Sequence, residues 1–201
     1  MDRKKFLLTS SLAVLGLSTY GSVVKLPNGK FNGDCETTND ILGPFYRPDA
    51  PLRSDLTYEG IEGSLIELNG IVYGSDCITP LKEAMIEIWQ CNAKGEYDND
   101  SNQYHLRGRL ITDASGKYAF TTIIPGKYMN GKLYRPSHIH FRITEKNSKE
   151  LISQVYFKGD PQIAQDPWAS KPQAELRTLE IIPQNTSGNL RVNFDIYLKG
   201  K

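Results

Sequence analysis

The feature that most constrains this chain is a series of short β-type segments, which runs from Leu65 to the C-terminus without any stretch of helical periodicity. Turn-forming residues separate the segments, as at Asp113-Ala114-Ser115-Gly116. In the last segment apolar residues occupy every second position, which places them on one face of a strand. The expected strands are Leu65–Tyr73, Met85–Asn92, Arg109–Thr112, Tyr118–Ile123, Ile139–Thr144, Leu151–Phe157, Leu176–Ile182 and Leu190–Leu198. About seven or eight short strands separated by turns predict an all-β fold, an antiparallel β-sandwich.

The residues before the expected sandwich divide into two parts. Residues 1–22 begin with a charged group, Met1-Asp2-Arg3-Lys4-Lys5, and continue with an apolar stretch that is too short to span a bilayer. This pattern predicts a signal peptide and an exported protein, periplasmic or extracellular. The alternative is an apolar N-terminal helix that packs on the domain of a cytoplasmic protein. Residues 23–64 predict an extended N-terminal arm, because Pro44 and Pro48 exclude a helix interior; residues 65–201 form the sandwich domain.

The three cysteines, Cys35, Cys77 and Cys91, do not have the spacing of a metal site. An exported protein could pair two of them and leave one free, whereas a cytoplasmic protein would keep three separate thiols. The sequence does not choose between these two arrangements.

Composition excludes several classes of function. The 24 Lys and Arg residues nearly balance the 23 Asp and Glu residues, so the chain has no broad basic field for nucleic acid. It lacks the glycine-rich phosphate loops, the nucleophile elbow and the CxxC pair of common enzyme classes. No segment is long and apolar enough for a membrane span.

The residues that point to chemistry are two histidines and two tyrosines. In His138-Ile139-His140 the two imidazoles project from the same face of a strand, so both can reach one metal ion. Such a pair by itself is more often a surface feature. Tyr97 and Tyr128 lie in turns nearby in the sequence. A phenol titrates near pH 10, so a strongly Lewis-acidic cation is needed to hold it as phenolate. Two phenolates and two imidazoles therefore favour Fe(III).

The sequence around these four residues resembles that of a known family. The stretch Ala84–Pro161 is similar to the intradiol ring-cleavage dioxygenases, and most similar to the β subunits of protocatechuate 3,4-dioxygenases. The matching segments are Glu87–Tyr97, Gly108–Asp113, Pro125–Tyr128, Arg135–Phe141 and Leu151–Pro161, with Gly43–Tyr46 before them and Phe194–Gly200 at the end. The resemblance covers roughly the whole of the chain after the leader, and it implies a sandwich with long active-site loops.

The resemblance also implies a metal centre and a reaction. Tyr97, Tyr128, His138 and His140 would bind a mononuclear non-haem Fe(III), with hydroxide as a further ligand. The enzyme would cleave a catecholic ring between its two hydroxyls and insert both atoms of O2, to give a cis,cis-muconate-type product. Tyr128 would be the tyrosinate that leaves the iron and accepts a proton when catechol binds.

Three further residues are implied around this centre. Arg135 matches the family's active-site arginine, which would stabilise negative charge on the bound ring; otherwise it is a surface cation. Gln154 matches a glutamine near the iron; otherwise it is an ordinary polar strand residue. Met129-Asn130 replace the Pro-Trp of the protocatechuate enzymes at a position that lines their substrate pocket, so Asn130 is expected near the substrate, and the resemblance does not identify protocatechuate as the substrate. His105 has no counterpart and is expected to be a loop histidine.

Two alternatives belong to other classes. A non-catalytic β-sandwich module could bind aromatics, sugars or a protein, since a fold does not fix a function. An extradiol dioxygenase would need Fe(II) held by two histidines and a carboxylate, which the two tyrosines do not match. The preferred catechol, a homo-oligomeric state and the need for a partner chain stay open.

Overall fold

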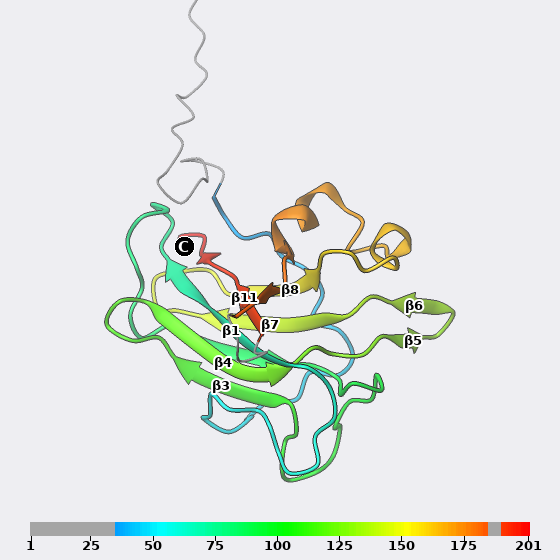
Figure 1. Cartoon of the computed structure of the whole chain (residues 1–201). Coiled ribbons are helices and arrows are strands. Elements are labelled where there is room, and N and C mark those ends of the chain that lie inside the picture. The colour runs from blue at the N-terminus through cyan, green and yellow to red at the C-terminus, as the bar shows by residue number, and fades with distance from the viewer. Residues whose placement is uncertain (1–34, 185–189) are drawn as a thin grey trace, which may run out of the picture.

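The computed structural model describes residues 35–184 and 190–201, and within these ranges the regular secondary structure is almost all strand, with two short 3-10 helices and long loops (Figure 1). The expected leader, residues 1–22, lies outside the described residues. No helix in the described ranges has the length and apolarity that a membrane crossing requires. The elements in chain order are β1 (Leu65–Tyr73), β2 (Met85–Trp89), β3 (Arg107–Ile111), β4 (Lys117–Ile123), β5 (Tyr128–Asn130), β6 (Leu133–Arg135), β7 (His138–Thr144), β8 (Leu151–Phe157), the 3-10 helices η1 (Ile163–Gln165) and η2 (Pro172–Arg177), β9 (Thr178–Leu179), β10 (Ile182–Pro183), β11 (Leu190–Asn193) and β12 (Ile196–Tyr197).

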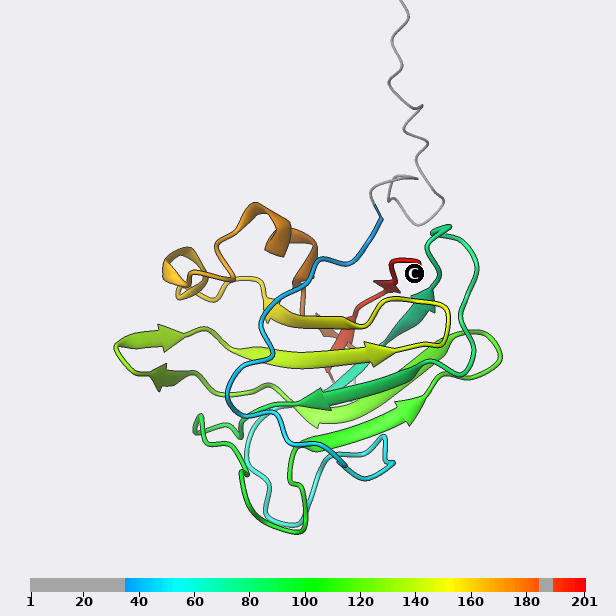
Figure 2. The ribbon, with the colours of Figure 1, turned by 180° about the vertical axis from the view of Figure 1, so that it is seen from behind.

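The strands form two layers, which confirms the predicted β-sandwich (Figures 1 and 2). One sheet has the order β10-β11-β1-β12, with β4 paired to β1, and the other has the order β3-β2-β7-β8-β9. Most long strands pair antiparallel, but β1 pairs in parallel with β11 and β12, and β8 pairs in parallel with β9. The short hairpin β5–β6 projects from one end of the sandwich.

Three expected strands are interrupted, replaced in part or shortened in the structure. The segment Leu190–Leu198 is interrupted between β11 and β12, because the Asp195 carboxylate accepts the backbone N–H of Ile71 in place of a ladder carbonyl. The expectation of a strand over Leu176–Ile182 is wrong for its first part. Pro172 starts the 3-10 helix η2, which continues to Arg177, and only the short strands β9 and β10 follow. The expected Met85–Asn92 ends earlier, at Trp89.

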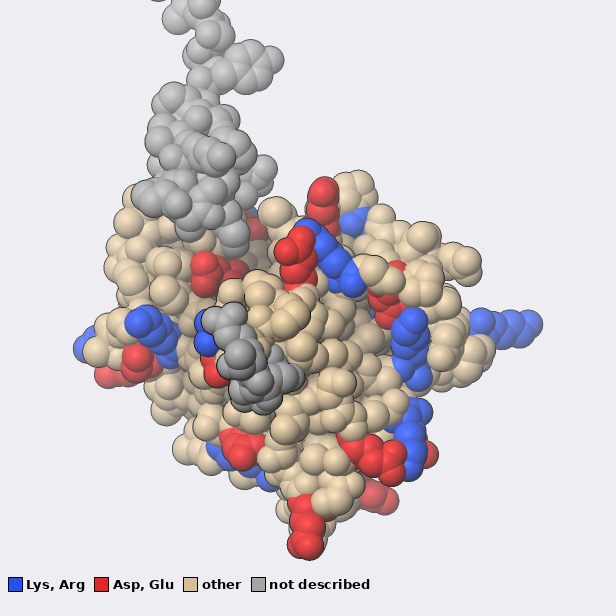
Figure 3. Space-filling model, viewed as in Figure 1, with Lys and Arg blue, Asp and Glu red and all other residues tan. Residues whose placement is uncertain are grey.

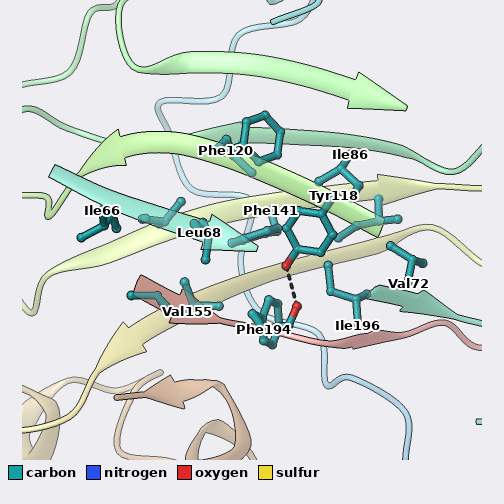
Figure 4. Packing of buried hydrophobic residues seen from close by; sticks show 14 of the residues in the cluster. Ile66, Leu68, Val72, Ile86, Tyr118, Phe120, Phe141, Val155, Phe194 and Ile196 are labelled. Carbon is teal, nitrogen blue, oxygen red and sulfur yellow. Dashed lines mark hydrogen bonds between the residues drawn. The ribbon is translucent and has the colours of Figure 1, made fainter. Parts of the chain in front are cut away.

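The hydrophobic core lies between the inner faces of the two sheets (Figure 4). From one sheet it receives Ile66, Leu68, Val72, Phe120 and Val192, and from the other Ile86, Ile88, Ile139, Phe141, Ile143 and Val155. The Tyr118 hydroxyl, which is also buried there, donates a hydrogen bond of 2.5 Å to the carbonyl of Phe194. The core between the sheets is therefore mainly apolar, and the Tyr118 phenol within it has a hydrogen-bond partner.

The arm covers the outer side of the second sheet. Its described part, residues 35–64, contains no helix or regular strand and runs across this sheet in Figure 2. The backbone N–H of Asp40 donates to the Ile152 carbonyl at 2.8 Å, so the arm follows the edge of β8. Cys35 and Cys77 form a disulfide with their Cα atoms 6.0 Å apart, while Cys91 is free and buried. The described part of the arm thus begins at a covalent link to the loop after β1.

Charged side chains are spread over the surface. On the face shown in Figure 3, basic and acidic groups alternate without an extended area of one sign. This distribution agrees with the near balance of 24 basic and 23 acidic residues in the sequence.

Candidate metal centre and active site

The candidate site lies on the outer face of the sheet β3-β2-β7-β8-β9, opposite the hydrophobic core. Along β7 the side chains alternate, so that Ile139 enters the core while His138 and His140 point to the other face. In register, His140 lies between Trp89 of β2 and Gln154 of β8. Both histidines are 1% exposed, because the arm and the loops cover this face.

The structure brings all four candidate ligands together. The ring centroids are separated by 5.5 Å for Tyr97 and Tyr128, 5.5 Å for Tyr128 and His138, and 5.0 Å for His138 and His140. The fourth pair, Tyr97 and His140, is separated by 6.3 Å. The hydroxyl oxygen of Tyr128 lies 3.5 Å from Nε2 of His138. The side chains therefore surround one small region.

Close contact between two loops positions the tyrosines. Tyr97 follows the turn after β2, and Tyr128 begins β5. Gly95 in the first loop has φ +85°, and a Cβ atom there would lie 2.4 Å from the carbonyl oxygen of Lys127 in the second. The backbone N–H of Gly126 donates to the Asn92 carbonyl at 2.9 Å. Glycine is thus required at position 95 for the two loops to meet.

The arm packs against the centre from outside. Phe45 stacks on Tyr97, with ring centroids 4.3 Å apart, and meets Tyr128 edge-on. Gly43 has φ +74°, and a Cβ atom there would lie 3.0 Å from Cε1 of His140. On the other side, Trp89 stacks on the His140 ring at 4.8 Å with an angle of 9° between the planes. These contacts fix the orientation of the rings and shield the His140 ring, which is 1% exposed.

Within the part of the chain that the structure describes, several phenol oxygen and imidazole nitrogen atoms of the cluster lack hydrogen-bond partners, as expected for atoms that bind a metal ion. Among the described residues, the Tyr97 hydroxyl and both ring nitrogens of His140 are buried without any hydrogen-bond partner. Buried polar atoms almost always have a partner, so the convergence of these atoms on one small region indicates a bound group. Nδ1 of His138 donates to the Pro136 carbonyl at 2.6 Å, which leaves its Nε2 lone pair directed at the centre. Two phenols and two imidazoles suit a hard, strongly Lewis-acidic cation.

Burial also sets the protonation states. It lowers the pKa of His138 to about 4 and the pKa of His140 well below its usual range, with the Arg135 charge acting in the same direction. Both imidazoles are therefore neutral at pH 7 and can coordinate a metal. Burial raises the pKa of Tyr97 well above its usual range and raises that of Tyr128 as well. Neither phenol would ionise by itself, so a cation must supply the stabilisation of a phenolate.

Arg135 and Gln154 belong to the same region. Arg135 ends β6, is 1% exposed and is therefore not a surface cation. Its Nη2 donates to Oε1 of Gln154 at 2.9 Å, and Nε2 of Gln154 donates to the Ile41 carbonyl of the arm. Gln154, which pairs with His140 across the two strands, is fully buried. The two side chains thus connect the metal-ligand candidates to the arm.

Asn130 lies at the margin of this region. It is half-buried on β5, opposite Leu133, and shares a face of the hairpin with Tyr128 two residues away. Its side chain has no hydrogen bond to the centre among the described residues. His105 lies in a loop against Tyr58, with ring centroids 4.1 Å apart, and outside the cluster.

Sequence reasoning missed Asp166, which is fully buried and holds Arg135. It also missed Asp40, Tyr156 and Arg177, which form a second buried polar group beside Gln154. A buried carboxylate in a loop belongs to no periodic pattern, so the sequence gives no signal for it. For the arm, the only signal was the resemblance of Gly43–Tyr46 to the corresponding segment of the family. No group of three or more His, Cys, Asp or Glu side chains suited to a metal occurs in the described ranges.

Comparison with known proteins agrees with this geometry. The sequence model of a family described as "Dioxygenase" matches residues 41–200. The chain is 33% identical over 190 residues to the protocatechuate 3,4-dioxygenase beta chain of Burkholderia cepacia, covering 83% of this chain and 80% of that protein. It is 32% identical to catechol 1,2-dioxygenase of Candida albicans, covering 71% of this chain but only 53% of that protein.

A solved structure shows the same arrangement of strands. The dioxygenase domain of a dioxygenase carbohydrate-binding protein fusion from Streptomyces sp. SirexAA-E superposes with a TM-score of 0.71 and 27% identity. The match covers 83% of this chain and 99% of that domain. With a family match over most of its length and an outer-face cluster of two tyrosines and two histidines, this chain belongs to the intradiol ring-cleavage dioxygenase family.

Proposed function

We propose that this protein is a non-haem Fe(III) dioxygenase that opens a catecholic ring between its two hydroxyls with O2. The observation that carries the proposal is the convergence of Tyr97, Tyr128, His138 and His140, of which the Tyr97 hydroxyl and His140 Nε2 are buried without a partner. The printed names of the relatives, which act on catechol and protocatechuate, support a catecholic substrate.

The donor set fits ferric iron, which when bound would keep both phenols ionised and act as the Lewis acid that receives the two catechol oxygens. The protein residues then have separate tasks. The imidazoles of His138 and His140 stay neutral and fixed, one by the Pro136 carbonyl and the other by the stacked Trp89. The oxygen of Tyr128 is the base that accepts a proton from a substrate hydroxyl, since a phenolate is basic at neutral pH.

Arg135 supplies the positive charge next to the reacting ring. A guanidinium stays charged throughout, and in a buried site it stabilises negative charge on a catechol more than it would in water. The arm and its Phe45 ring keep bulk water from the same region. Asn130 is the residue we assign to the substrate side of the four-ligand centre, where it would affect the choice of ring substituent.

The test is oxygen uptake by the iron-loaded protein with catechol, protocatechuate, hydroxyquinol and chlorinated catechols. We expect uptake with at least one of them, and both oxygen atoms of labelled O2 in a muconate-type product. Tyr97→Phe should remove the activity, and His105→Ala, a histidine outside the cluster, should retain it. Iron-loaded protein that binds catechols without consuming O2 would instead support the binding-module alternative.

We also propose that the protein is exported. The Cys35–Cys77 disulfide supports this, because structural disulfides form in oxidising compartments and are rare in the cytosol. N-terminal sequencing of the protein from its host should find a start near residue 23, and thiol titration of the unfolded protein without reductant should find only Cys91. An intact Met1 in a cytoplasmic fraction, together with three free thiols, would contradict export.

A further inference from the structure

The strongest unassigned feature is a buried carboxylate beside Arg135. Asp166 lies in the loop between η1 and η2 and is 0% exposed. Its Oδ1 accepts the backbone N–H groups of Trp168 at 2.9 Å and Ala169 at 2.8 Å, which closes the loop. Its Oδ2 accepts the Nε–H of Arg135 at 2.5 Å. One carboxylate therefore both shapes the loop and holds the arginine.

The other contacts of Arg135 leave one direction free. Nη2 donates to Gln154, whose amide is fixed in turn by the Ile41 carbonyl. The ring of Trp168 lies over the guanidinium, with its centroid 4.5 Å from Cζ. Within the described ranges no residue accepts a hydrogen bond from Nη1.

Arg135 needs both a counter-charge and two anchors if its guanidinium is to keep one orientation. A long arginine side chain loses its preferred orientation when one end of its planar fork is released, and a buried cation without a counter-charge is costly. Asp166 supplies both the counter-charge and the anchor at Nε, and Gln154 anchors the neighbouring edge. The two anchors fix the plane of the guanidinium.

We propose that Asp166 is a positioning residue, which holds Arg135 so that its Nη1 is directed at the ring of a catechol bound at the four-ligand centre. The inference deepens the proposed function and rests on it. Asp166 would not touch the substrate, and its effect on the reaction would pass through Arg135.

The first test is Asp166→Asn, which keeps the shape of the side chain and an oxygen for the loop N–H groups. We expect kcat to fall by about 10²-fold, as for other small losses of orientation, and KM for catechol to change less than threefold. Iron content and the position of the tyrosinate-to-iron absorption band should stay those of the wild type, because the four ligands are unchanged. A merely structural role would instead lower the iron content and leave kcat per iron unaltered.

The matched control is Asp76→Asn. Asp76 closes its own loop through the same pattern, with Oδ1 accepting the backbone N–H groups two and three residues later, but it is not paired with an arginine. The Asp76→Asn enzyme should retain the kcat and KM of the wild type. Asp166→Glu, which restores the charge with a longer stem, should recover part of the lost kcat.

The double variant decides whether the effect passes through Arg135. We expect Arg135→Gln to lower kcat strongly, and adding Asp166→Asn to it to cost less than twofold more, since residues that act together are not additive. A full additional loss in the double variant, or an Asp166→Asn enzyme with wild-type kcat, would overturn the inference alone. A wild-type protein without the iron–tyrosinate band would overturn the proposed function, and this inference with it.

Discussion

The two faces of the sheet β3-β2-β7-β8-β9 are buried to a similar degree but consist of different chemistry. On the inner face Ile139 and Phe141 pack into an apolar core, and the nearby Tyr118 hydroxyl has a carbonyl partner. On the outer face His138 and His140, from the same strand, meet two tyrosines whose polar atoms are only partly paired. One face therefore stabilises the fold, and the other keeps donor atoms available at a cost in stability.

The difference implies that activity and stability should respond to different substitutions. Changes on the inner face should lower the free energy of unfolding and leave the iron centre intact. Changes on the outer face should remove iron or activity and leave the apo protein as stable as before. Three substitutions test this separation, and a fourth, at the contact between the arm and the metal-ligand candidates, is expected to affect both properties.

The largest effect is expected for Tyr97→Phe, which deletes one oxygen from the outer face. Loss of a ligand should cost more than the about 100-fold typical for an outer-shell partner, so activity should fall below detection and the visible band should weaken. Because the hydroxyl has no partner among the described residues, the apo protein should not be destabilised. Activity assays and urea denaturation of the apo protein measure both quantities. If Tyr97→Phe lowered the stability of the apo protein and left activity unchanged, the outer face would have the structural role that we assign to the inner face.

Phe120→Ala should have the next largest effect, but on the stability of the fold and not on activity. Phe120, from β4 of the opposite sheet, is fully buried in the core against which the inner face packs, so its truncation should lower the free energy of unfolding by about 3–5 kcal/mol. The folded fraction should still bind iron and keep its kcat. Denaturant titration gives the stability, and iron content per folded chain gives the second readout. Loss of iron from protein that remains folded would show that the two faces are not independent.

Gly43→Ala lies where the arm touches the metal ligands and should affect both properties. The positive φ costs a side chain about 1–2 kcal/mol, and the added Cβ would lie 3.0 Å from Cε1 of His140. We expect a modest loss of stability together with a shifted visible band in the iron-loaded protein. Gly60→Ala has the same kind of φ, +80°, with nothing within 4 Å, and should lose stability without a spectral shift.

Tyr118→Phe should have the smallest effect and is the counterpart of Tyr97→Phe. It removes a hydroxyl that donates to the Phe194 carbonyl in the core, so stability should fall by about 1 kcal/mol. Iron content, the visible band and activity should not change. Equal stability losses for the two tyrosine variants would contradict the difference between the faces.

The sequence predicted most of what depends on local periodicity. The bounds of β1 and β8 are those expected from the sequence, and the His-Ile-His pattern correctly placed both imidazoles on one face of β7. The break at Asp195 was not predictable, because it depends on a hydrogen bond to Ile71, which is 124 residues away in the chain.

The surroundings of the centre were less predictable for the same reason. The Arg135–Asp166 pair joins a strand to a 3-10 loop 31 residues later, and the Tyr156–Asp40 hydrogen bond joins residues 116 apart. No local pattern marks such partners. The disulfide likewise required coordinates, since three cysteines allow several pairings.

The most direct test of the account is titration of the apo protein with ferric iron, followed by visible absorption and resonance Raman spectroscopy. We predict one iron per chain and a tyrosinate-to-iron charge-transfer band, which shifts when catechol binds, is lost in His140→Ala and persists in His105→Ala. A fully iron-loaded protein that stays colourless, or that keeps its band in His140→Ala, would contradict the claim that these two phenols and two imidazoles share a single ferric ion.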